Sequence, residues 1–414
     1  MNPIFSNARK AASALASKSS EQRNRLLIEL ADKILGSVPE LLQANAADLA
    51  LMDKSNPLYD RLMLTEERIG AIASDMKNVA TLPDPVGRVL EKRVLPNGLE
   101  LEKRAFPYGV IGIVYEARPN VTFDVFSLCF KSGNACILKG GKDAENSNRK
   151  AMEIIRLCLS ENGFDPDAAN LLPSSREATT ELMQARGMVD LVIPRGGRKL
   201  IDYVRESCRI PFIETGAGVV HEYFDEFGDL EIGRRTVCNA KTRRVSVCNA
   251  LDCLLIHSKR LPDLPRICAP LAAFKVEIFC DKDCMDMLEK GGYPSDLLKL
   301  ATDESYGTEF LSLRMAVKKV DSLEQAVGHI ARYGSGHSES IITDNAENAR
   351  KFQNAVDAAC VYVNAPTSFT DGAQFGLGAE IGISTQKLGA RGPMGLQELM
   401  TYKWLITGSG QTRP

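Results

Sequence analysis

The chain has 414 residues, of which 44% are hydrophobic and 25% are charged, a composition typical of a soluble globular protein with a large core. Its length predicts about two or three domains. The formal net charge is −2 and the basic residues are scattered, which disfavours binding to nucleic acid or to an acidic membrane surface.

The N-terminus lacks the apolar core of a signal peptide, and no apolar run approaches the roughly 18 residues of a membrane span. The 11 cysteines, an odd number without an export signal, indicate reduced thiols and predict a cytoplasmic protein. No two cysteine pairs have zinc-ligand spacing and the chain has only 4 histidines, so the sequence predicts no metal site.

Residues 1–80 are predicted to be mainly helical, and Ser19 to Gln22 resembles a capping box that opens one of these helices. Prolines at residues 83–87 break this pattern. Residues 89–103 then alternate polar and apolar side chains around Pro96-Asn-Gly98, which predicts a two-stranded ribbon. Because an exposed ribbon commonly pairs with another chain, we interpret it as a subunit contact.

From Gly109 onwards short β-branched runs alternate with helical patterns, which predicts a parallel sheet covered by helices on both faces. Such sheets bind ligands beyond the carboxyl ends of their strands. A second α/β series follows Cys248, and a last strand ends the chain. The expected strands are 109–115, 135–139, 169–172, 189–193, 210–214, 251–257, 274–279, 314–320, 340–343, 360–364 and 401–407, with helices at 323–332 and 346–355 in the second series.

Cys248 lies between a cationic cluster (Lys241, Arg243 and Arg244) and the apolar run 254–256, which is predicted to be a buried strand. Nearby positive charge lowers the pKa of a thiol, and only the thiolate is a good nucleophile. This setting makes Cys248 a candidate for covalent catalysis. The local sequence also allows a plainer interpretation, in which Cys248 is a small buried hydrophobe, as most free cysteines are.

No strand is followed by the dinucleotide fingerprint G-x-G-x-x-G. Residues 194–199, Pro-Arg-Gly-Gly-Arg-Lys, fit a phosphate site better, since they join a predicted strand to a helical pattern; an ordinary glycine turn is an equal alternative. Lys139 ends another strand and could bind a ribose or a 2′-phosphate, or be exposed. Asn120 could donate its amide to a developing oxyanion, or serve as a turn residue after proline.

Six motifs in chain order resemble those of the γ-glutamyl phosphate reductase family, the glutamate-5-semialdehyde dehydrogenases of proline biosynthesis within the aldehyde dehydrogenase superfamily. They are Tyr115-Glu-Ala-Arg-Pro-Asn120, Asn239-Ala-Lys241, Val247-Cys-Asn-Ala250, His329-Ile-Ala-Arg-Tyr-Gly-Ser-Gly-His337, Phe369-Thr-Asp-Gly372 and Ala390-Arg-Gly-Pro-Met-Gly395. The resemblance covers nearly the whole chain.

The resemblance implies an α/β fold of the aldehyde dehydrogenase type, with a Rossmann-type cofactor domain, an α/β catalytic domain and a small β oligomerisation element. Residues 1–95 and 110–215 are expected to form the NADP(H)-binding domain. Residues 216–370 are expected to form the catalytic domain, and residues 96–109 and 395–414 the oligomerisation element.

The resemblance also implies roles for individual residues. Cys248 is the expected nucleophile, and Asn120 is expected to form an oxyanion hole with the Cys248 backbone amide. The residues expected beside the cofactor are Lys139, Gly140, Pro194, Arg195, Gly196, Gly197, Arg198 and, at the nicotinamide ribose, Glu309. The cations expected to attract the phosphate and carboxylate of the substrate are Lys241, Arg244 and Arg391.

The implied reaction is the NADPH-dependent reduction of L-glutamate 5-phosphate to L-glutamate 5-semialdehyde with release of phosphate, by a homo-oligomer that associates with glutamate 5-kinase. Two alternatives are a hydrolytic aldehyde dehydrogenase, which would need Glu214 as a base, and a non-enzymatic protein on the same fold. The chain departs from the family in having Asp252-Cys253 for Glu-Thr and Pro366-Thr-Ser368 for Ser-Thr-Arg. The second change removes a cation near the expected substrate site.

Overall fold

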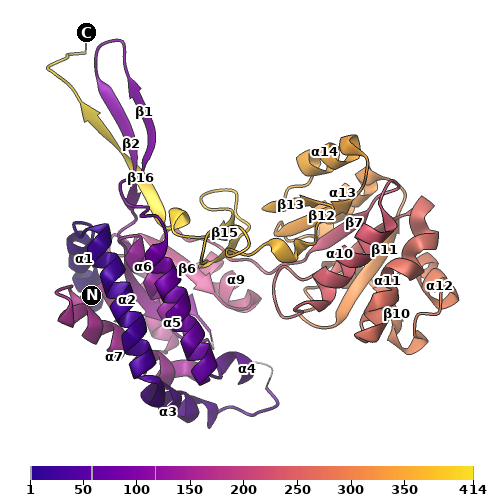
Figure 1. Cartoon of the computed structure of the whole chain (residues 1–414), viewed down its shortest axis with the longest axis horizontal. Helices are drawn as coiled ribbons and strands as arrows, with labels where there is room; N and C mark the ends of the chain where they lie inside the picture. The colour runs from indigo at the N-terminus through magenta and orange to yellow at the C-terminus, as the bar shows by residue number, and fades with distance from the viewer. Residues whose placement is uncertain (1, 57–58, 117, 414) are drawn as a thin grey trace. The chain divides into compact units, whose positions relative to one another are not determined.

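The computed structural model describes residues 2–56, 59–116 and 118–413. The chain divides into two compact units. Unit 1 comprises Met1–Thr215, Gly376–Gly382 and Met394–Pro414, and unit 2 comprises Gly216–Phe375 and Ile383–Pro393. Figure 1 labels many of the helices and strands of the two units. In the described part of the chain, no helix combines the length and the apolar character that crossing a membrane requires.

The first helices of unit 1 confirm the helical start of the chain. At the capping box, Gln22 N donates to Ser19 Oγ and Ser19 N donates to Gln22 Oε1, so the helix begins where the sequence predicts. The apolar stripe of this helix packs against the fifth helix. These helices are α1 (Pro3–Leu15), α2 (Ser20–Gly36), α3 (Val38–Leu49), α4 (Tyr59–Leu62) and α5 (Glu66–Thr81).

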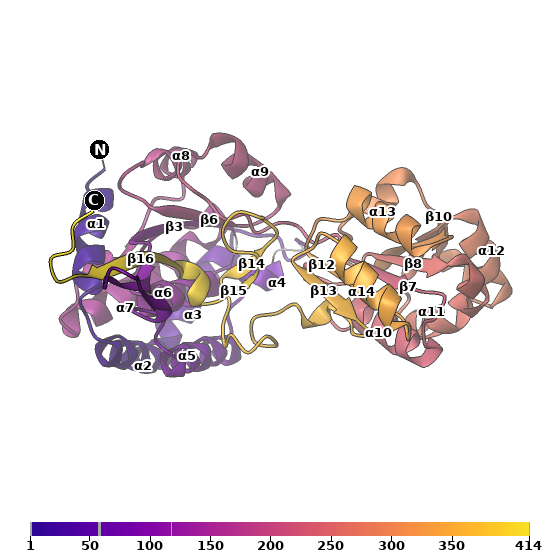
Figure 2. The ribbon, with the colours of Figure 1, turned by 90° about the horizontal axis from the view of Figure 1, so that it is seen from above.

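A parallel sheet of four strands in the order β5-β4-β3-β6 forms the centre of unit 1. The strands are β3 (Val110–Tyr115), β4 (Ala135–Lys139), β5 (Ala169–Leu171) and β6 (Leu191–Arg195). The connecting helices are α6 (Asn120–Lys131), α7 (Glu145–Glu161), α8 (Arg176–Gln184) and α9 (Arg198–Ser207). Figure 2 shows α8 and α9 on one face of this sheet and α6 and α7 on the other. β3 and β4 are fully buried, as expected of a doubly covered parallel sheet.

The strand predicted at residues 210–214 is wrong. This segment makes a single bridge, between Val192 and Phe212, beside β6. Pro211 has no N–H to donate to a ladder, so the segment cannot extend the sheet as a regular strand. It still contacts β6, because Ile213 N donates to Val192 O and Val192 N donates to Pro211 O.

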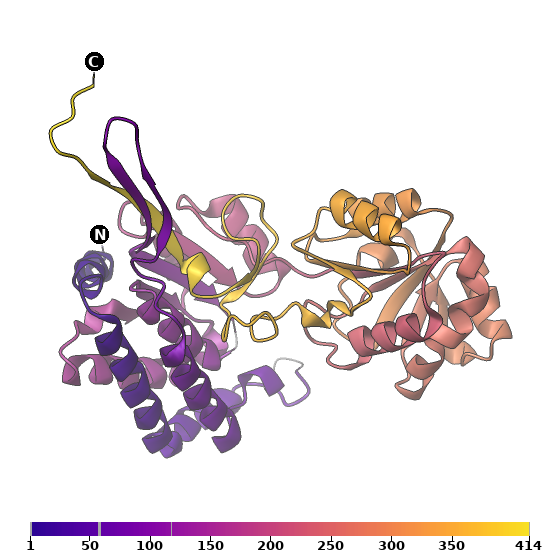
Figure 3. The same cartoon turned by 45° about the horizontal axis from the view of Figure 1, so that its top comes forward.

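The predicted ribbon is confirmed, and the end of the chain extends it. The strands β1 (Val89–Val94), β2 (Glu100–Pro107) and β16 (Met400–Thr407) pair antiparallel in the order β1-β2-β16. Figure 3 shows the ribbon projecting from the helices and the sheet of unit 1. All six residues of β1 are exposed. The exposed apolar side chains of the ribbon include Val94, Trp404 and Ile406.

Unit 2 contains a parallel sheet of seven strands in the order β10-β9-β11-β8-β7-β12-β13, with β8 at its centre. The strands are β7 (His221–Phe224), β8 (Cys253–His257), β9 (Glu277–Cys280), β10 (Leu298–Leu300), β11 (Arg314–Val320), β12 (Ser338–Ile342) and β13 (Cys360–Val363). One apolar core lies between the sheet and α10 (Leu230–Thr242), α11 (Leu264–Ala273) and α12 (Lys282–Lys290). A second core lies between the opposite face and α13 (Leu323–Tyr333) and α14 (Ala346–Ala355).

Short elements complete the chain. Two strands, β14 (Gly382–Ser384) and β15 (Gly392–Met394), pair with each other. The 3₁₀ helices are η1 (Lys142–Ala144), η2 (Pro166–Ala168), η3 (Ser258–Asp263), η4 (Ser295–Leu297), η5 (Asp303–Gly307), η6 (Thr367–Phe369) and η7 (Gln397–Leu399).

Candidate active site

Cys248 lies in the turn between α10 and β8 and is partly exposed. The buried strand predicted after it is confirmed as β8, whose five residues are all buried. The segment around η6 fixes the turn, because Asn249 Nδ2 donates to Thr370 O (2.9 Å) and Thr367 Oγ1 donates to Asn249 O (2.9 Å). The nucleophile candidate is therefore held on a rigid turn at the edge of a core strand.

The imidazole of His337 lies against the Cys248 thiol, with His337 Nε2 at 3.2 Å from Cys248 Sγ. Complete burial lowers the pKa of His337 to about 4. The ring is therefore neutral at pH 7 and can accept a proton from the thiol, the arrangement that activates cysteine nucleophiles. His337 lies in a motif that matches the family but has no role assigned from the sequence; a histidine in such a motif, in a chain with only 4, is the signal that could have identified it.

Hydrogen bonds continue from His337 away from the thiol. His337 Nδ1 lies 2.8 Å from Ser338 Oγ, which lies 2.7 Å from Thr370 Oγ1, and the Tyr362 hydroxyl lies 2.7 Å from the same Thr370 oxygen. When Nδ1–H donates to Ser338, Nε2 is left as the acceptor facing Cys248. The chain of hydroxyls can accept the Nδ1–H of the tautomer that a base for Cys248 needs.

Glu309 belongs to the same part of unit 2 as Cys248. Gly218 N donates to Glu309 Oε1 (3.1 Å), and a Cβ on Gly218 would lie 1.7 Å from Cys248 O. Only glycine allows this close approach of two backbone segments. Phe310 N also donates to Asp252 Oδ1 (3.0 Å), which ties the residue after Glu309 to the segment after Cys248.

The three expected substrate cations differ in their surroundings. Lys241 is fully buried, and its Nζ donates to Leu251 O (2.7 Å) and lies 4.0 Å from Asp252 Oδ1. Burial lowers the pKa of Lys241, and the Asp252 carboxylate opposes that shift. Arg244 is exposed, whereas Arg391 donates to Asp357 Oδ1 (2.7 Å). Of the three, Lys241 anchors the segment that follows the nucleophile.

In unit 1, a cleft of about 800 Å³ runs along α7 and the edge strand β5 and reaches the carboxyl ends of β4 and β5, where Gly140, Gly141 and Ser174 line it. Lys139 is 8% exposed and its Nζ donates to Ser174 O (3.0 Å); burial lowers its pKa. A Cβ on Gly140 would lie 2.3 Å from Asn148 Nδ2, so glycine lets the strand end approach α7. This is the place where open α/β sheets bind ligands.

The glycine turn between β6 and α9 already binds a carboxylate of this chain. Gly197 N donates to Glu116 Oε2 (2.9 Å), and a Cβ on Gly196 would lie 2.6 Å from the same oxygen. The start of α9 is therefore an anion site, as expected for a helix N-terminus. Pro194 and Arg195 end β6 just before it, and the side chain of Arg198 lies outside the described part of the chain.

Asn120 begins α6 in unit 1, and its Nδ2 donates to Asp124 Oδ2 (2.8 Å). Burial raises the pKa of Asp124 to about 6. Glu214, also in unit 1, forms an ion pair with Arg205. Asn120 and Cys248 belong to different units, so an oxyanion hole formed by both is part of the proposal below.

No family model matches the chain. A γ-glutamyl phosphate reductase of Bacteroides thetaiotaomicron is 58% identical over 413 residues, which cover 100% of this chain and 99% of the relative. One from Chlorobium luteolum is 57% identical over 408 residues, 98% of this chain and 96% of the relative.

Solved structures are similar over the same length. The γ-glutamyl phosphate reductase of Thermotoga maritima has a TM-score of 0.95 at 39% identity and covers 100% of this chain and 99% of its own. An acetylating aldehyde dehydrogenase of Geobacillus thermoglucosidasius has a TM-score of 0.69 at 16% identity, covering 100% and 97%, and shares the fold. With relatives of this identity matched from end to end, the chain belongs to the γ-glutamyl phosphate reductase family, on an aldehyde dehydrogenase-like fold.

Proposed function

We propose that the chain reduces L-glutamate 5-phosphate to L-glutamate 5-semialdehyde with NADPH and releases phosphate, in the cytoplasm. The observation that carries this proposal is the Cys248–His337 pair, a partly exposed thiol 3.2 Å from a buried neutral imidazole, in a member of this family. A thiolate generated in this way attacks an acyl phosphate readily, because phosphate is a good leaving group.

In the first step, the Cys248 thiol gives its proton to His337 Nε2 and the thiolate forms a bond to the acyl carbon. The bond from that carbon to the phosphate oxygen then breaks, and inorganic phosphate leaves with the electron pair. The Cys248 backbone amide and Asn120 donate to the oxyanion; one such donor typically stabilises the transition state by about 3–4 kcal/mol. To donate both N–H groups outward, Asn120 has to release Asp124.

NADPH, when bound, supplies the hydride that reduces the resulting thioester. Because burial lowers its pKa to about 4, His337 does not hold the proton at pH 7 and passes it to the departing phosphate, which leaves as hydrogen phosphate. When the carbon–sulfur bond breaks and the aldehyde leaves, a proton from water restores the Cys248 thiol. Each cycle then consumes one hydride and one proton, and protons and electrons balance over it.

The residues of unit 1 fit a dinucleotide. The end of the cleft that reaches the carboxyl ends of β4 and β5 is lined by Gly140 and suits a cofactor, and Lys139 supplies a cation beside it for a ribose or 2′-phosphate. Backbone amides of Gly196 and Gly197 at the start of α9 suit a phosphate, which would replace the Glu116 carboxylate there. In unit 2, Glu309 is proposed to bind the nicotinamide ribose.

For the substrate, we propose that Arg244 and Arg391 attract the phosphate and the carboxylate. Arg244 is exposed, and Arg391 would exchange its Asp357 partner for a substrate anion. The burial of Lys241 changes the role that we propose for it, from binding the substrate to positioning the turn that carries Cys248.

We propose that the β1-β2-β16 ribbon joins copies of the chain into a homo-oligomer. Its exposed apolar side chains support this proposal, because the two edge strands expose Val94 on β1 and Trp404 and Ile406 on β16 to water and gain from pairing. Since an acyl phosphate hydrolyses readily, an association with glutamate 5-kinase would shorten its exposure to water.

The test is the reverse reaction. Purified protein is given L-glutamate 5-semialdehyde and NADP⁺, with and without inorganic phosphate, and NADPH absorbance is followed. We expect reduction of NADP⁺ that requires phosphate and disappears in Cys248→Ser. Phosphate-independent reduction that yields glutamate would instead identify a hydrolytic aldehyde dehydrogenase, which the ion pair between Glu214 and Arg205 disfavours.

A further inference from the structure

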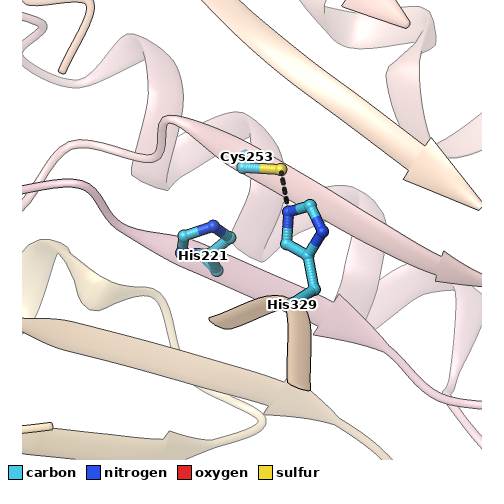
Figure 4. A group of neighbouring side chains, drawn as sticks. All are labelled: His221, Cys253 and His329. Atoms are coloured by element: carbon cyan, nitrogen blue, oxygen red, sulfur yellow. Dashed lines mark hydrogen bonds between the residues drawn. The ribbon is translucent and has the colours of Figure 1, made fainter. Parts of the chain in front are cut away.

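Three side chains with metal-ligand chemistry meet inside unit 2. His221 comes from β7, Cys253 begins β8 and His329 lies on α13 (Figure 4). Their ligand atoms all lie within 4.8 Å of one another, and Cys253 Sγ is 3.9 Å from His329 Nε2. His221 and Cys253 are fully buried, and His329 is 7% exposed.

Several buried polar atoms at this cluster have no hydrogen-bond partner among the described residues. They are both ring nitrogens of His221 and Oε1 of Glu339, on two side chains that are fully buried. Glu339 Oε2 accepts the His221 backbone N–H (2.7 Å) and lies 3.2 Å from His221 Nδ1, close enough to accept a ring N–H after a small rotation. Native structures seldom leave such atoms unsatisfied, and an ion is one of the usual reasons where they do.

We propose that His221, Cys253 and His329 bind a divalent metal ion of borderline softness, with Zn²⁺ as the preferred ion. Two imidazoles and one thiolate form a ligand set that selects Zn²⁺ over the oxygen-seeking Mg²⁺ and Ca²⁺. With Zn–N near about 2.0 Å and Zn–S near about 2.3 Å, ligand atoms of a tetrahedral site lie about 3.5 Å apart. The Cys253–His329 separation of 3.9 Å is close to that value, and the widest gap closes by side-chain shifts of about 1 Å.

The charges and hydrogen bonds around the cluster support the site. On binding, Cys253 releases its thiol proton to water, and the thiolate together with the Glu339 carboxylate balances the two positive charges of the ion. Glu339 accepts the Nδ1–H of His221 and thereby orients Nε2 toward the metal, the usual arrangement behind a metal-bound histidine. The ion would join two neighbouring strands and a helix of one sheet layer.

Cys253→Thr removes the thiol ligand while keeping a small side chain at the start of β8. Cys268, a buried cysteine in the core on the other face of the sheet, provides a matched control in Cys268→Ala. The Cys248–His337 pair is a second place where a metal could bind, so Cys248→Ser separates the two.

The experiment uses the full-length protein, stripped by a chelator and titrated with Co²⁺ and then with Zn²⁺. We expect one equivalent of Co²⁺ with a thiolate-to-cobalt absorption band, displaced by Zn²⁺. The band should persist in Cys268→Ala and Cys248→Ser, and the affinity should fall at least about 100-fold in Cys253→Thr and about 10- to 100-fold in Glu339→Gln. Zn²⁺ should raise the Tm of the wild type and of Cys268→Ala, and leave that of Cys253→Thr unchanged.

Absence of stoichiometric binding to the wild type would overturn the proposal whatever the variants do. Binding that survives in Cys253→Thr, or that disappears in Cys248→Ser, would overturn it as well, because the ion would then lie at other ligands. If Cys253→Thr folds poorly, which a lower Tm without metal would show, the test relies on Glu339→Gln, which leaves all three ligands in place. Wild-type metal affinity in Glu339→Gln would then overturn the proposal.

Discussion

Two cysteine–histidine pairs in unit 2 have the same side chains but differ in exposure, in distance and in surroundings. Cys248 is partly exposed in a turn, and its partner His337 lies at 3.2 Å. Cys253 is buried at the start of β8, 3.9 Å from His329, and burial raises the pKa of its thiol well above the usual value. The comparison shows that surroundings decide what a thiol does: an accessible thiol with one base suits covalent catalysis, and a buried one among several donors suits an ion.

The largest expected effect comes from the Cys248–His337 pair. Cys248→Ser should lower kcat for phosphate-dependent NADP⁺ reduction by at least about 10³-fold, because the hydroxyl is a far weaker nucleophile than the thiolate. Cys268→Ala, which changes a buried cysteine outside both pairs, should keep the wild-type rate. A loss in Cys253→Thr as large as that in Cys248→Ser would contradict the division of roles between the two pairs.

The next effect concerns the base. Burial holds the pKa of His337 at about 4, so in the wild type the ring can accept a proton at any pH above that value and loses this capacity only as the pH falls through about 4. His337→Gln should lower kcat about 10²-fold at pH 7. The deficit should shrink toward pH 9, because a rising pH ionises a thiol without the help of a base. A deficit that is constant from pH 7 to pH 9 would rule out the role of base.

A third prediction follows from the close packing of Gly218 against the backbone of Cys248. Gly218→Ala places a Cβ 1.7 Å from Cys248 O, so one of the two segments has to move. We expect kcat to fall by about 10²-fold, since a misplacement of about 1 Å costs that much. Gly328→Ala in α13 is the matched control, because a Cβ there meets nothing within 4 Å and should leave kcat unchanged. Equal activity in the two variants would show that Cys248 tolerates displacement.

The smallest effect is expected at the hydroxyl behind the base. Ser338→Ala removes the partner of His337 Nδ1, and a single hydrogen bond of about 0.5–1.5 kcal/mol corresponds to a loss in kcat of roughly 2- to 13-fold. In a His337→Gln background the same change should have no further effect. An additive loss in the double variant would mean that Ser338 acts on something other than His337.

Much of the fold follows from local sequence. β4 and β11 have the predicted bounds, and β4 is a short, mainly apolar run between turn signals. β7 escaped prediction because two of its four residues, His221 and Glu222, are polar yet buried, a state that only their partners in the folded chain explain. α10 was missed although Asp229, whose side chain caps Ile232 N, is a recognisable start signal.

The site was predictable only where its residues are neighbours in the chain. Motifs identified Cys248, but His337 lies 89 residues away, and no periodicity or spacing connects two such positions. His221, Cys253 and His329 are also far apart in the sequence, and their spacing matches no metal-binding motif. The lack of such a motif does not exclude a cluster formed by folding. Lys241, a cation within a matched motif, is buried against Leu251 and Asp252, a state that its neighbours in the sequence do not reveal.

The partial exposure of Cys248 determines how the protein reacts with thiol reagents. Eight of the 11 cysteines are buried, and only Cys208 and Cys238 share the partly exposed state of Cys248. Burial raises the pKa of Cys208, which slows its alkylation. Of the three, Cys248 has an imidazole nitrogen 3.2 Å from its sulfur, so alkylating agents and oxidants should reach it before Cys208 and Cys238 and well before the buried cysteines of the core.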